Sequence, residues 1–463
     1  MKVCVLGLGY IGLPTAAMMA SAGHDVVGYD IDAALLEALR TGTFNIKEGP
    51  VHKLVAAMLQ LGALTLATSL PHDADAYIIC VSTPTINYKP DLSYVQAAAQ
   101  TVASVLVPGN LVVLESTVPP NTMDRTVVKA LRAGGIDPDS VAVAHCPERV
   151  IPGEIVQELR TNSRVIGGRK PGDAERARDL YASFTDGAIY LTDNVTAELV
   201  KVIENTYRDV NIAYANELAL LCEELGVDAQ EAIMLANHHP RVDILQPGPG
   251  VGGHCIPVDP HFLSNANPFV TELIQASRRV NERMPHVIVR RIVEFVSPRV
   301  GAVIAILGAT YKANVDDTRQ SPTARLEELL IERGYATRVF DPHAKRYERP
   351  LAASWADAVT GAHAIVLMVD HDAFRSLEPA KVAPFMRERI LIDTRAFFDA
   401  AHWEGVGFQV YTLGGRRRIA FSPPFALSIN SAKTINRRHS ERRVATTLRG
   451  ELEAVAQDDA AAG

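Results

Sequence analysis

A cysteine on a glycine-rich segment is the residue best suited to covalent chemistry. Residues 247–259 read PGPGVGGHCIPVD, so Cys255 follows two glycines and precedes the carboxylate of Asp259 by four residues. Glycines let a substrate approach the backbone, and such a loop presents the thiol as a nucleophile requires. Most cysteines are core residues instead. A metal site is a further alternative, and it would use His254, Cys255, Asp259 and His261. Their spacing matches no common zinc pattern, so we expect no metal.

A second chemical signature lies at residues 7–12, which read GLGYIG. This is G-x-G-x-x-G between an expected strand and an expected helix, and Asp30 ends the next strand. The three glycines permit a tight turn, close approach of a pyrophosphate and close helix packing, and the helix N-terminus faces the anion. Asp30 can bind both ribose hydroxyls and would repel a 2′-phosphate, which favours NAD over NADP. The alternative is a glycine turn with a purely structural role. The expected cofactor contacts here are Gly7, Gly9, Tyr10, Ile11, Gly12 and Asp30.

A polar stripe on an expected long helix is the third candidate. Lys201, Asn205 and Arg208 are spaced by four and three residues, so they share one helix face. Such a stripe either is solvated surface or lines a cleft and offers donors to an oxyanion or a phosphate. The spacing leaves both interpretations open.

The elements that must position these residues form three regions before a tail. Residues 1–193 predict an α/β domain, because a strand at 2–6, a glycine turn, a helix at 13–22 and a strand at 25–29 make one βαβ unit. Further strand-like runs follow at 77–81, 111–114 and 141–144. The pattern is typical of a parallel doubly wound sheet.

Residues 194–225 contain no proline or glycine and show helical periodicity, which predicts one long helix. A smaller helical middle domain is expected to continue to 297. A second α/β domain is expected at 298–413, with strands at 303–307, 337–340, 364–369 and 390–393. The predicted fold is therefore two Rossmann-like doubly wound domains joined by a long central helix and a helical middle domain.

Composition limits the remaining possibilities. The formal net charge of −7 gives no overall basic footprint for nucleic acid. No long uncharged apolar stretch is present and the chain begins directly with a strand, so we expect no membrane insertion and a cytoplasmic location. Five scattered cysteines favour a reducing compartment. Residues 414–463 are arginine-rich and then acidic, which predicts a mostly disordered tail, with partner or lipid binding as the alternative.

Taken together, these segments resemble the UDP-glucose/GDP-mannose dehydrogenase family over about residues 1–413. The resemblance rests on the glycine turn, EST at 115–117, PER at 147–149, Lys201 with Asn205, the GGHC loop, and YK at 311–312 followed by DTRQS at 317–321. It implies oxidation of a sugar C6 alcohol to a carboxylate with two NAD per sugar. Cys255 would form a thiohemiacetal and then a thioester that water cleaves.

The resemblance also implies roles for particular residues. Lys201 and Asn205 would stabilise an oxyanion, Asp259 would position Lys201 or a water, and Glu148 would be the general base for hydrolysis. Thr117 would contact the water or the nicotinamide, and Lys312 and Arg319 would meet the UDP-sugar and the cofactor. The alternative for these two is an ion pair with Asp316 or Asp317. Further expected contacts are Thr83, Thr117 and Arg319 with the cofactor, and Glu148, Arg149, Val150, Lys201, Asn205, Arg208, His239, Arg241, Gly252, Tyr311 and Lys312 with the substrate.

Within the family, residues 146–153 and 239–250 look most like members that oxidise UDP-N-acetyl-D-mannosamine. Val258 stands where UDP-glucose enzymes usually carry lysine, which favours an N-acetylated sugar. UDP-N-acetylglucosamine and UDP-glucose are the alternative substrates. An ordinary two-electron hydroxyacid dehydrogenase would explain the NAD site but not the cysteine loop, and a NAD-binding scaffold of polysaccharide assembly would explain neither the cysteine nor its polar neighbours. The family resemblance also implies a homodimer or a higher homo-oligomer.

Overall fold

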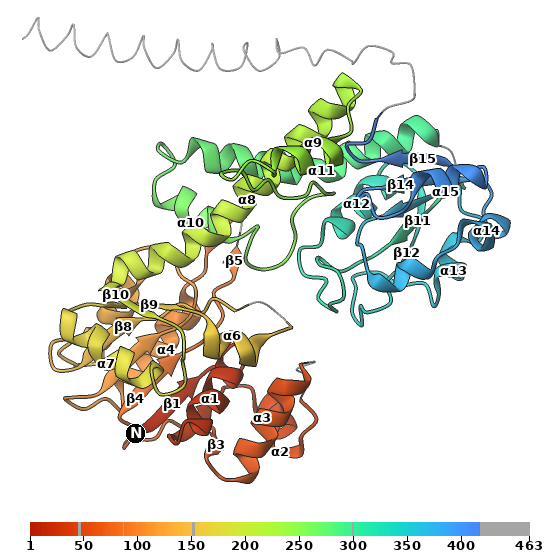
Figure 1. Ribbon diagram of the computed structural model, residues 1–463. Helices are drawn as coiled ribbons and strands as arrows, with labels where there is room; N and C mark the ends of the chain where they lie inside the picture. Colours follow the sequence, from red (N-terminus) through yellow and green to blue (C-terminus); the bar gives the residue numbers. More distant parts are fainter. Residues whose placement is uncertain (45–47, 87, 151–152, 299–300, 417–463) are drawn as a thin grey trace, which may run out of the picture. The chain divides into compact units, whose positions relative to one another are not determined.

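The computed structural model describes residues 1–416 apart from 45–47, 87, 151–152 and 299–300 (Figure 1). Most of the expected tail, from residue 417 on, lies outside the described residues. Its first three residues, 414–416, are described, and Gly414 is buried, donating its N–H to Glu223. None of the helices in the described part of the chain has the length and apolar character that a membrane span needs.

The amino-terminal region forms one eight-stranded sheet with the order β10-β9-β8-β7-β4-β1-β2-β3. Its strands are β1 (Lys2–Leu6), β2 (Asp25–Tyr29), β3 (Leu64–Ala67), β4 (Ala76–Ile79), β7 (Leu111–Leu114), β8 (Ala142–His145), β9 (Arg164–Gly168) and β10 (Ile189–Asp193). All neighbouring pairs are parallel except β8 and β9, which are antiparallel. The predicted doubly wound sheet is confirmed, whereas β3, β9 and β10, and the reversal at β9, were not predicted.

Side chains alternate between the two faces of this sheet, so each face has its own apolar core. One face packs on α1 (Gly12–Ser21), α2 (Ala33–Thr41), α3 (Gly49–Gln60), α6 (Ile155–Thr161) and α7 (Pro171–Tyr181). The other packs on α4 (Ser93–Ala103), the π-helix η1 (Met123–Val128) and α5 (Lys129–Ala133). A separate two-stranded hairpin pairs β5 (Thr85–Ile86) with β6 (Lys89–Pro90). Because helices cover both faces, the loops at the carboxyl ends of the strands are left to build a site.

The long helix α8 (Asn194–Leu225) has the bounds that the sequence predicts. It begins after Asp193, whose side chain accepts the N–H of Thr196, and ends at Gly226 in the left-handed conformation at φ +69°. The other helices of the middle region are α9 (Ala229–Ala236), α10 (Asp259–Ala266) and α11 (Glu272–Phe295), and α11 runs alongside α8. A helix of this length places residues about 1.5 Å apart along one rigid axis.

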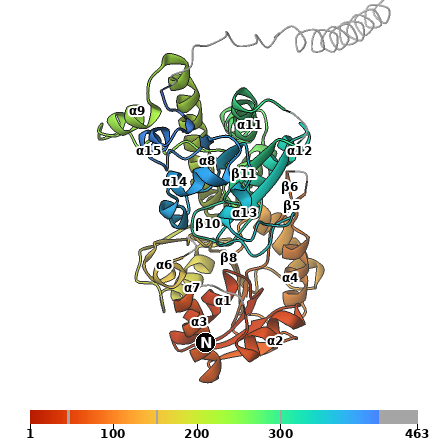
Figure 2. The same cartoon turned by 90° about the vertical axis from the view of Figure 1, so that its right-hand side faces the viewer.

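A second sheet follows, with five parallel strands in the order β12-β11-β13-β14-β15 (Figure 2, blue-green to blue). The strands are β11 (Val303–Leu307), β12 (Ala336–Phe340), β13 (Ala364–Leu367), β14 (Ile390–Asp393) and β15 (Gln409–Thr412). Its helices are α12 (Pro322–Ile331), α13 (Trp355–Val359), η2 (Asp372–Ser376), α14 (Pro379–Val382), η3 (Ala383–Phe385) and α15 (Ala400–Gly405). The predicted second α/β unit is thereby confirmed.

The two sheets repeat one local arrangement after their first strands. In the first sheet, the N–H of Leu8 donates to the carboxylate of Asp30, which follows β2, at 2.8 Å. In the second, the N–H of Ala309 donates to the carboxylate of Asp341, which follows β12, at 2.7 Å. Both turns contain a glycine at φ near +90°. The two predicted Rossmann-like units therefore share this arrangement of glycine turn and aspartate.

Candidate active site

The glycine turn after β1 is built to bring a ligand against the backbone. A Cβ atom added to Gly12 would lie 1.9 Å from the carbonyl oxygen of Gly7, so helix α1 can approach the turn only with glycine there. A Cβ added to Gly9 would meet no protein atom within 4 Å, so the space beside that residue is open. An open backbone at a helix N-terminus suits an anion such as a pyrophosphate. The turn therefore fits a dinucleotide.

Asp30 stands beside this turn at the end of β2. One carboxylate oxygen accepts the N–H of Leu8 at 2.8 Å and the other accepts the N–H of Asp32 at 2.9 Å. A carboxylate has about four lone-pair sites, so these two contacts orient the side chain and leave acceptors for ribose hydroxyls. Tyr10 is half exposed and donates its hydroxyl to Glu48 at 2.7 Å.

Two further expected cofactor contacts meet at the carboxyl edge of the same sheet. The hydroxyl of Thr83 donates to the carbonyl oxygen of Thr117 at 2.7 Å, which joins the loops after β4 and β7. Both residues are half-buried. Nearby, Glu198 of α8 accepts the N–H groups of Asn121 and Met123, so the long helix is fixed to the loop that carries Thr117.

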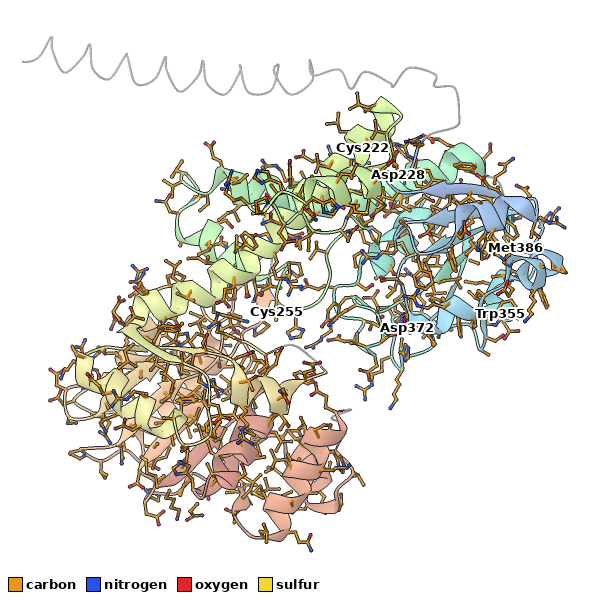
Figure 3. The ribbon with its side chains drawn as sticks, in the orientation of Figure 1. Cys222, Asp228, Cys255, Trp355, Asp372 and Met386 are labelled. Atoms are coloured by element: carbon orange, nitrogen blue, oxygen red, sulfur yellow. The ribbon has the colours of Figure 1, made fainter. Side chains whose placement is uncertain are left out.

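The segment that carries Cys255 (labelled in Figure 3) is held by hydrogen bonds to α8 and to Arg319. Asn216 of α8 accepts the N–H of Gly248 at 2.8 Å, and the carbonyl oxygen of Arg319 accepts the N–H of Gly253 at 3.0 Å. Gly253 has φ +91°, and a Cβ there would lie 3.0 Å from the ring of Tyr311. The loop can thus pass close to the second α/β unit because glycine occupies this position.

Cys255 is half-buried beside a lysine and a carboxylate. Burial and, to a smaller extent, the charge of Asp259 raise the pKa of its thiol to about 11, while the charges of Lys201 and Arg319 oppose this rise. The thiol is therefore protonated at neutral pH in this structure. A nucleophilic role requires the proton to leave as the sulfur attacks.

Asp259 connects the cysteine loop to the long helix. Its carboxylate accepts the side-chain N–H of Asn205 at 2.5 Å, and its backbone N–H donates to the carbonyl oxygen of Cys255 at 2.9 Å. Burial raises the pKa of Asp259 to about 6, against the Asn205 hydrogen bond and the charge of Lys201. Three residues singled out from the sequence, Lys201, Asn205 and Asp259, are thus brought together next to the thiol.

Glu148 lies in a second buried cluster at the carboxyl edge of the first sheet. It accepts a hydrogen bond from Arg164 at 3.2 Å, and the same guanidinium lies 3.9 Å from the carboxylate of Glu115. The thiol of Cys80 donates to Glu115 at 2.8 Å. Burial and the charge of Glu148 raise the pKa of Glu115 to about 7, while Arg164 opposes this. One buried arginine therefore serves two buried carboxyl groups.

Arg164 was not singled out from the sequence. It begins strand β9, is 4% exposed, and stacks over the ring of Tyr181 at 4.9 Å. No spacing rule links residue 164 to the PER segment at 147–149, because the contact depends on the unpredicted antiparallel pairing of β9. An arginine within an apolar strand pattern was the signal available.

Family models match most of the chain in three consecutive pieces. Residues 1–185 match the NAD binding domain of the UDP-glucose/GDP-mannose dehydrogenase family, residues 195–283 its central domain, and residues 305–400 its UDP binding domain. The chain belongs to the UDP-glucose/GDP-mannose dehydrogenase family. It is an NAD-dependent UDP-sugar dehydrogenase by this membership.

Individual relatives narrow the comparison. A UDP-N-acetyl-D-mannosamine dehydrogenase from Methanococcus maripaludis is 42% identical over 424 residues, which cover 89% of this chain and 97% of the relative. An NDP-N-acetyl-D-galactosaminuronic acid dehydrogenase from Ralstonia nicotianae is also 42% identical, over 86% of this chain and 96% of the relative. A solved UDP-D-ManNAc dehydrogenase from Pyrococcus horikoshii matches with a TM-score of 0.84 and 42% identity over 89% of this chain and 99% of that one.

Other residues predicted for this dehydrogenase are placed less directly. Arg149 pairs with Glu204 of α8 at 2.5 Å, and Val150 packs on the core of the first sheet. Arg208 is exposed and lies within electrostatic range of Tyr311. Lys312 is exposed.

The remaining points concern Arg319, the pair His239 and Arg241, and the metal alternative. Arg319 forms the ion pair with Asp317 that was its alternative interpretation, at 2.6 Å, and its charge also opposes the rise in the pKa of Cys255. His239 and Arg241 are exposed, and the described contacts do not join either to the Cys255 cluster. The metal alternative has no support in the described residues, which contain no group of three or more His, Cys, Asp and Glu side chains arranged to hold an ion.

Proposed function

We propose that this chain oxidises the C6 alcohol of UDP-N-acetyl-D-mannosamine to the carboxylate. The reaction removes four electrons and uses two NAD per sugar. The observation that carries the proposal is the half-buried Cys255 with Lys201 and Asp259 in electrostatic contact, on the loop that begins α10. A dehydrogenase limited to two electrons has no use for a covalent nucleophile at that place.

The choice of sugar is supported by the relatives. The Methanococcus and Pyrococcus proteins are named for UDP-N-acetyl-D-mannosamine, at 42% identity over most of both chains. The Ralstonia protein has the same identity and is named for an N-acetyl-D-galactosaminuronic acid nucleotide. An N-acetylated sugar is common to these names, and the configuration at the ring carbons is the point that an assay must decide. UDP-N-acetylglucosamine and UDP-glucose remain alternatives from the sequence.

The first half of the reaction is an alcohol oxidation. NAD, when bound at the Gly7–Gly12 turn and Asp30, supplies the hydride acceptor for both oxidations. Lys201 and Asn205 lie on one face of α8 and would donate to the C6 oxygen as negative charge develops on it. Asp259 holds the amide of Asn205 in place through its 2.5 Å hydrogen bond. Thr117 would contact a water or the cofactor.

The second half uses the thiol. The sulfur of Cys255 adds to the C6 aldehyde, its proton is lost and the aldehyde oxygen gains a proton, which gives a thiohemiacetal. Transfer of a hydride from this carbon to the second NAD, with loss of the hydroxyl proton, gives a thioester on Cys255, and attack by water then releases the carboxylate and regenerates the thiol. Glu148, held by Arg164, would accept the proton of the attacking water. UDP would be held by Tyr311, Lys312 and the neighbouring backbone of the second α/β unit.

We further infer a homodimer or a higher homo-oligomer that uses α8, and a cytoplasmic location. Support for the assembly comes from large apolar side chains exposed along this helix: Ile203, Tyr207, Tyr214 and Leu221. Each is about half exposed, and an exposed apolar stripe on a helix often marks a protein–protein interface. Sedimentation of wild type and of Tyr207→Lys would test it, since a monomeric wild type would contradict the inference.

The test of the function is the NADH formed per sugar at limiting sugar. UDP-N-acetylmannosamine, UDP-N-acetylgalactosamine, UDP-N-acetylglucosamine and UDP-glucose are compared in parallel, and the product is identified by mass spectrometry. About two NADH per UDP-N-acetylmannosamine, with this sugar preferred, is the expected result. Two NADH with another sugar preferred would refute the substrate, and one NADH would refute the thioester route.

A further inference from the structure

A fully buried imidazole lies beneath the loop that carries Tyr311 and Lys312. His371 follows β13 and is 0% exposed. Its Nε2 lies 2.9 Å from the carboxylate of Asp341 and 3.2 Å from the hydroxyl of Thr310. Its Nδ1 accepts the backbone N–H of Asn314 at 2.9 Å. The ring therefore joins the end of β12 to both ends of the loop at residues 310–314.

The partners of His371 fix its protonation. Nδ1 accepts a backbone N–H, so it carries no proton, and Nε2 must then donate. Asp341 is suited to receive that proton as a carboxylate, because it accepts four backbone N–H groups as well, at distances from 2.7 to 3.1 Å. Hydrogen bonds from His371 and the backbone hold the pKa of Asp341 well below its usual value, against the effect of burial. His371 is thus the neutral Nε2–H tautomer.

Asn314 closes the same loop from the outside. It adopts the left-handed conformation at φ +60°. Its side-chain amide donates to the carboxylate of Asp372 at 2.7 Å, and the N–H of Asp372 donates back to the amide oxygen at 3.1 Å (Asp372 in Figure 3). Thr310 donates to the carbonyl oxygen of Lys312 at 2.9 Å, which tightens the loop from within. Backbone and side chains therefore define one loop conformation.

The loop at residues 310–314 packs against the segment that carries Cys255. Cβ atoms added to Gly252 or Gly253 would lie 2.9 and 3.0 Å from atoms of Tyr311, so the tyrosine is packed against both glycines. Its N–H donates to the carbonyl oxygen of Asp317 at 3.0 Å. Cys255 is two residues beyond Gly253. A shift of the loop would move Tyr311 away from the turn that aims the thiol.

We propose that His371 is a positioning residue for the UDP-sugar. As a neutral bridge between Asp341 and Asn314 it fixes Tyr311 and Lys312, and through Tyr311 the turn before Cys255. The proposal rests on the proposed function in one respect, since it takes Tyr311 and Lys312 as contacts of the UDP-sugar. His371 itself lies beneath the loop and would not touch the substrate.

Two substitutions separate the two ends of the bridge. In His371→Asn the amide oxygen can replace Nδ1 as acceptor for Asn314, and the contact with Asp341 is lost. In His371→Gln the amide N–H can replace Nε2 as donor to Asp341, and the contact with Asn314 is lost. We expect His371→Gln to weaken binding of UDP by about tenfold, because the partly buried backbone N–H of Asn314 loses its acceptor, and to raise KM for the UDP-sugar equally. His371→Asn should change both less, and KM for NAD should stay within about twofold.

A matched control is available in the same domain. His363 is 2% exposed and accepts the N–H of Val303 through its Nδ1 at 3.0 Å. Val303 is at the start of β11 whereas the loop follows the end of that strand, so His363→Asn alters a buried imidazole away from the loop. It should lower Tm with unchanged UDP affinity. Asn314→Gly, on an exposed residue that already has positive φ, provides a milder perturbation of the loop should the His371 variants not fold.

Binding of UDP alone, measured by calorimetry, is the primary measurement, because it does not depend on turnover. UDP affinity equal to wild type in His371→Gln and Asn314→Gly, with Tm lowered as in His363→Asn, would overturn the proposal. A wild type that binds UDP but does not oxidise UDP-N-acetylmannosamine would refute the proposed function and leave the role of His371 to be decided by the UDP affinities.

Discussion

The ionisation of Cys255 gives the sharpest prediction, because its reactivity follows the thiolate form. A pKa of about 11 instead of 9.0 leaves about a hundredfold less thiolate near pH 8 than an ordinary cysteine has. Iodoacetamide should therefore alkylate Cys255 slowly at pH 7, at a rate that rises about tenfold per pH unit up to about pH 10.

Two substitutions should shift this rate in opposite directions. The charge of Asp259 raises the pKa of the thiol and the charge of Lys201 lowers it. Asp259→Asn should accelerate alkylation at pH 8 and Lys201→Met should slow it, each by about three- to tenfold for a partly screened charge. Both substitutions should reduce turnover. In Asp259→Asn the thiol would therefore be alkylated faster although the enzyme turns over more slowly.

The assay follows the peptide that contains Cys255 by mass spectrometry, from pH 6.5 to pH 10, with Cys255→Ser to identify background labelling. A rate that is flat between pH 7 and pH 9 would mean a resting thiolate. That result, or the same direction of change in both variants, would refute the electrostatic reasoning.

Three further predictions concern the first α/β unit. The added Cβ of Gly9→Ala would meet no protein atom, so Tm should stay within about 1 °C, whereas NAD affinity measured by calorimetry should fall by tenfold or more. An unchanged NAD affinity would show that the pyrophosphate does not bind at this turn. Asp30→Asn should raise KM for NAD by about tenfold and reduce the preference of the enzyme for NAD over NADP. The measurement is steady-state kinetics with both cofactors, and unchanged constants would mean that Asp30 has a purely structural role. Glu115→Gln addresses pH: the pKa of Glu115 is raised to about 7, so its stabilisation is present below its usual value of 4.5 and is lost as pH rises through 7. Thermal unfolding from pH 5 to pH 8 should show wild type losing about 1 to 3 kcal/mol more than the variant, and parallel curves would contradict this.

Much of the fold was predictable because its signals are local. β1, β2, β7, β11 and β14 are short apolar runs between turns, and α8 has a capping aspartate and a terminal glycine. β10 was missed because Ile189–Asp193 has only three apolar residues and no fully buried one, and β3 is similarly short with a single buried residue. Strand order and the reversal at β9 depend on pairing between distant segments, which periodicity does not encode.

The site divides in the same way. Cys255, Asp259, Lys201 and Asn205 could be chosen from two segments with recognisable spacing, and the structure places them together. Arg164 and His371 could not, because their importance lies in partners that are distant in sequence. His239 and Arg241 are the opposite case. They could be selected from a sequence motif, but in the single chain they are exposed and the described contacts do not join them to Cys255 or its neighbours.

The paired aspartates after the second strand of each sheet differ in one consequential way. Asp30 has two backbone contacts and spare acceptors, whereas Asp341 receives four backbone N–H groups and an imidazole. Such a carboxylate has its lone pairs filled from within the protein and cannot recognise a ribose. A chain that uses one architecture twice must keep its two halves from competing for the same dinucleotide, and the internal saturation of Asp341 removes the ribose acceptor from the second half.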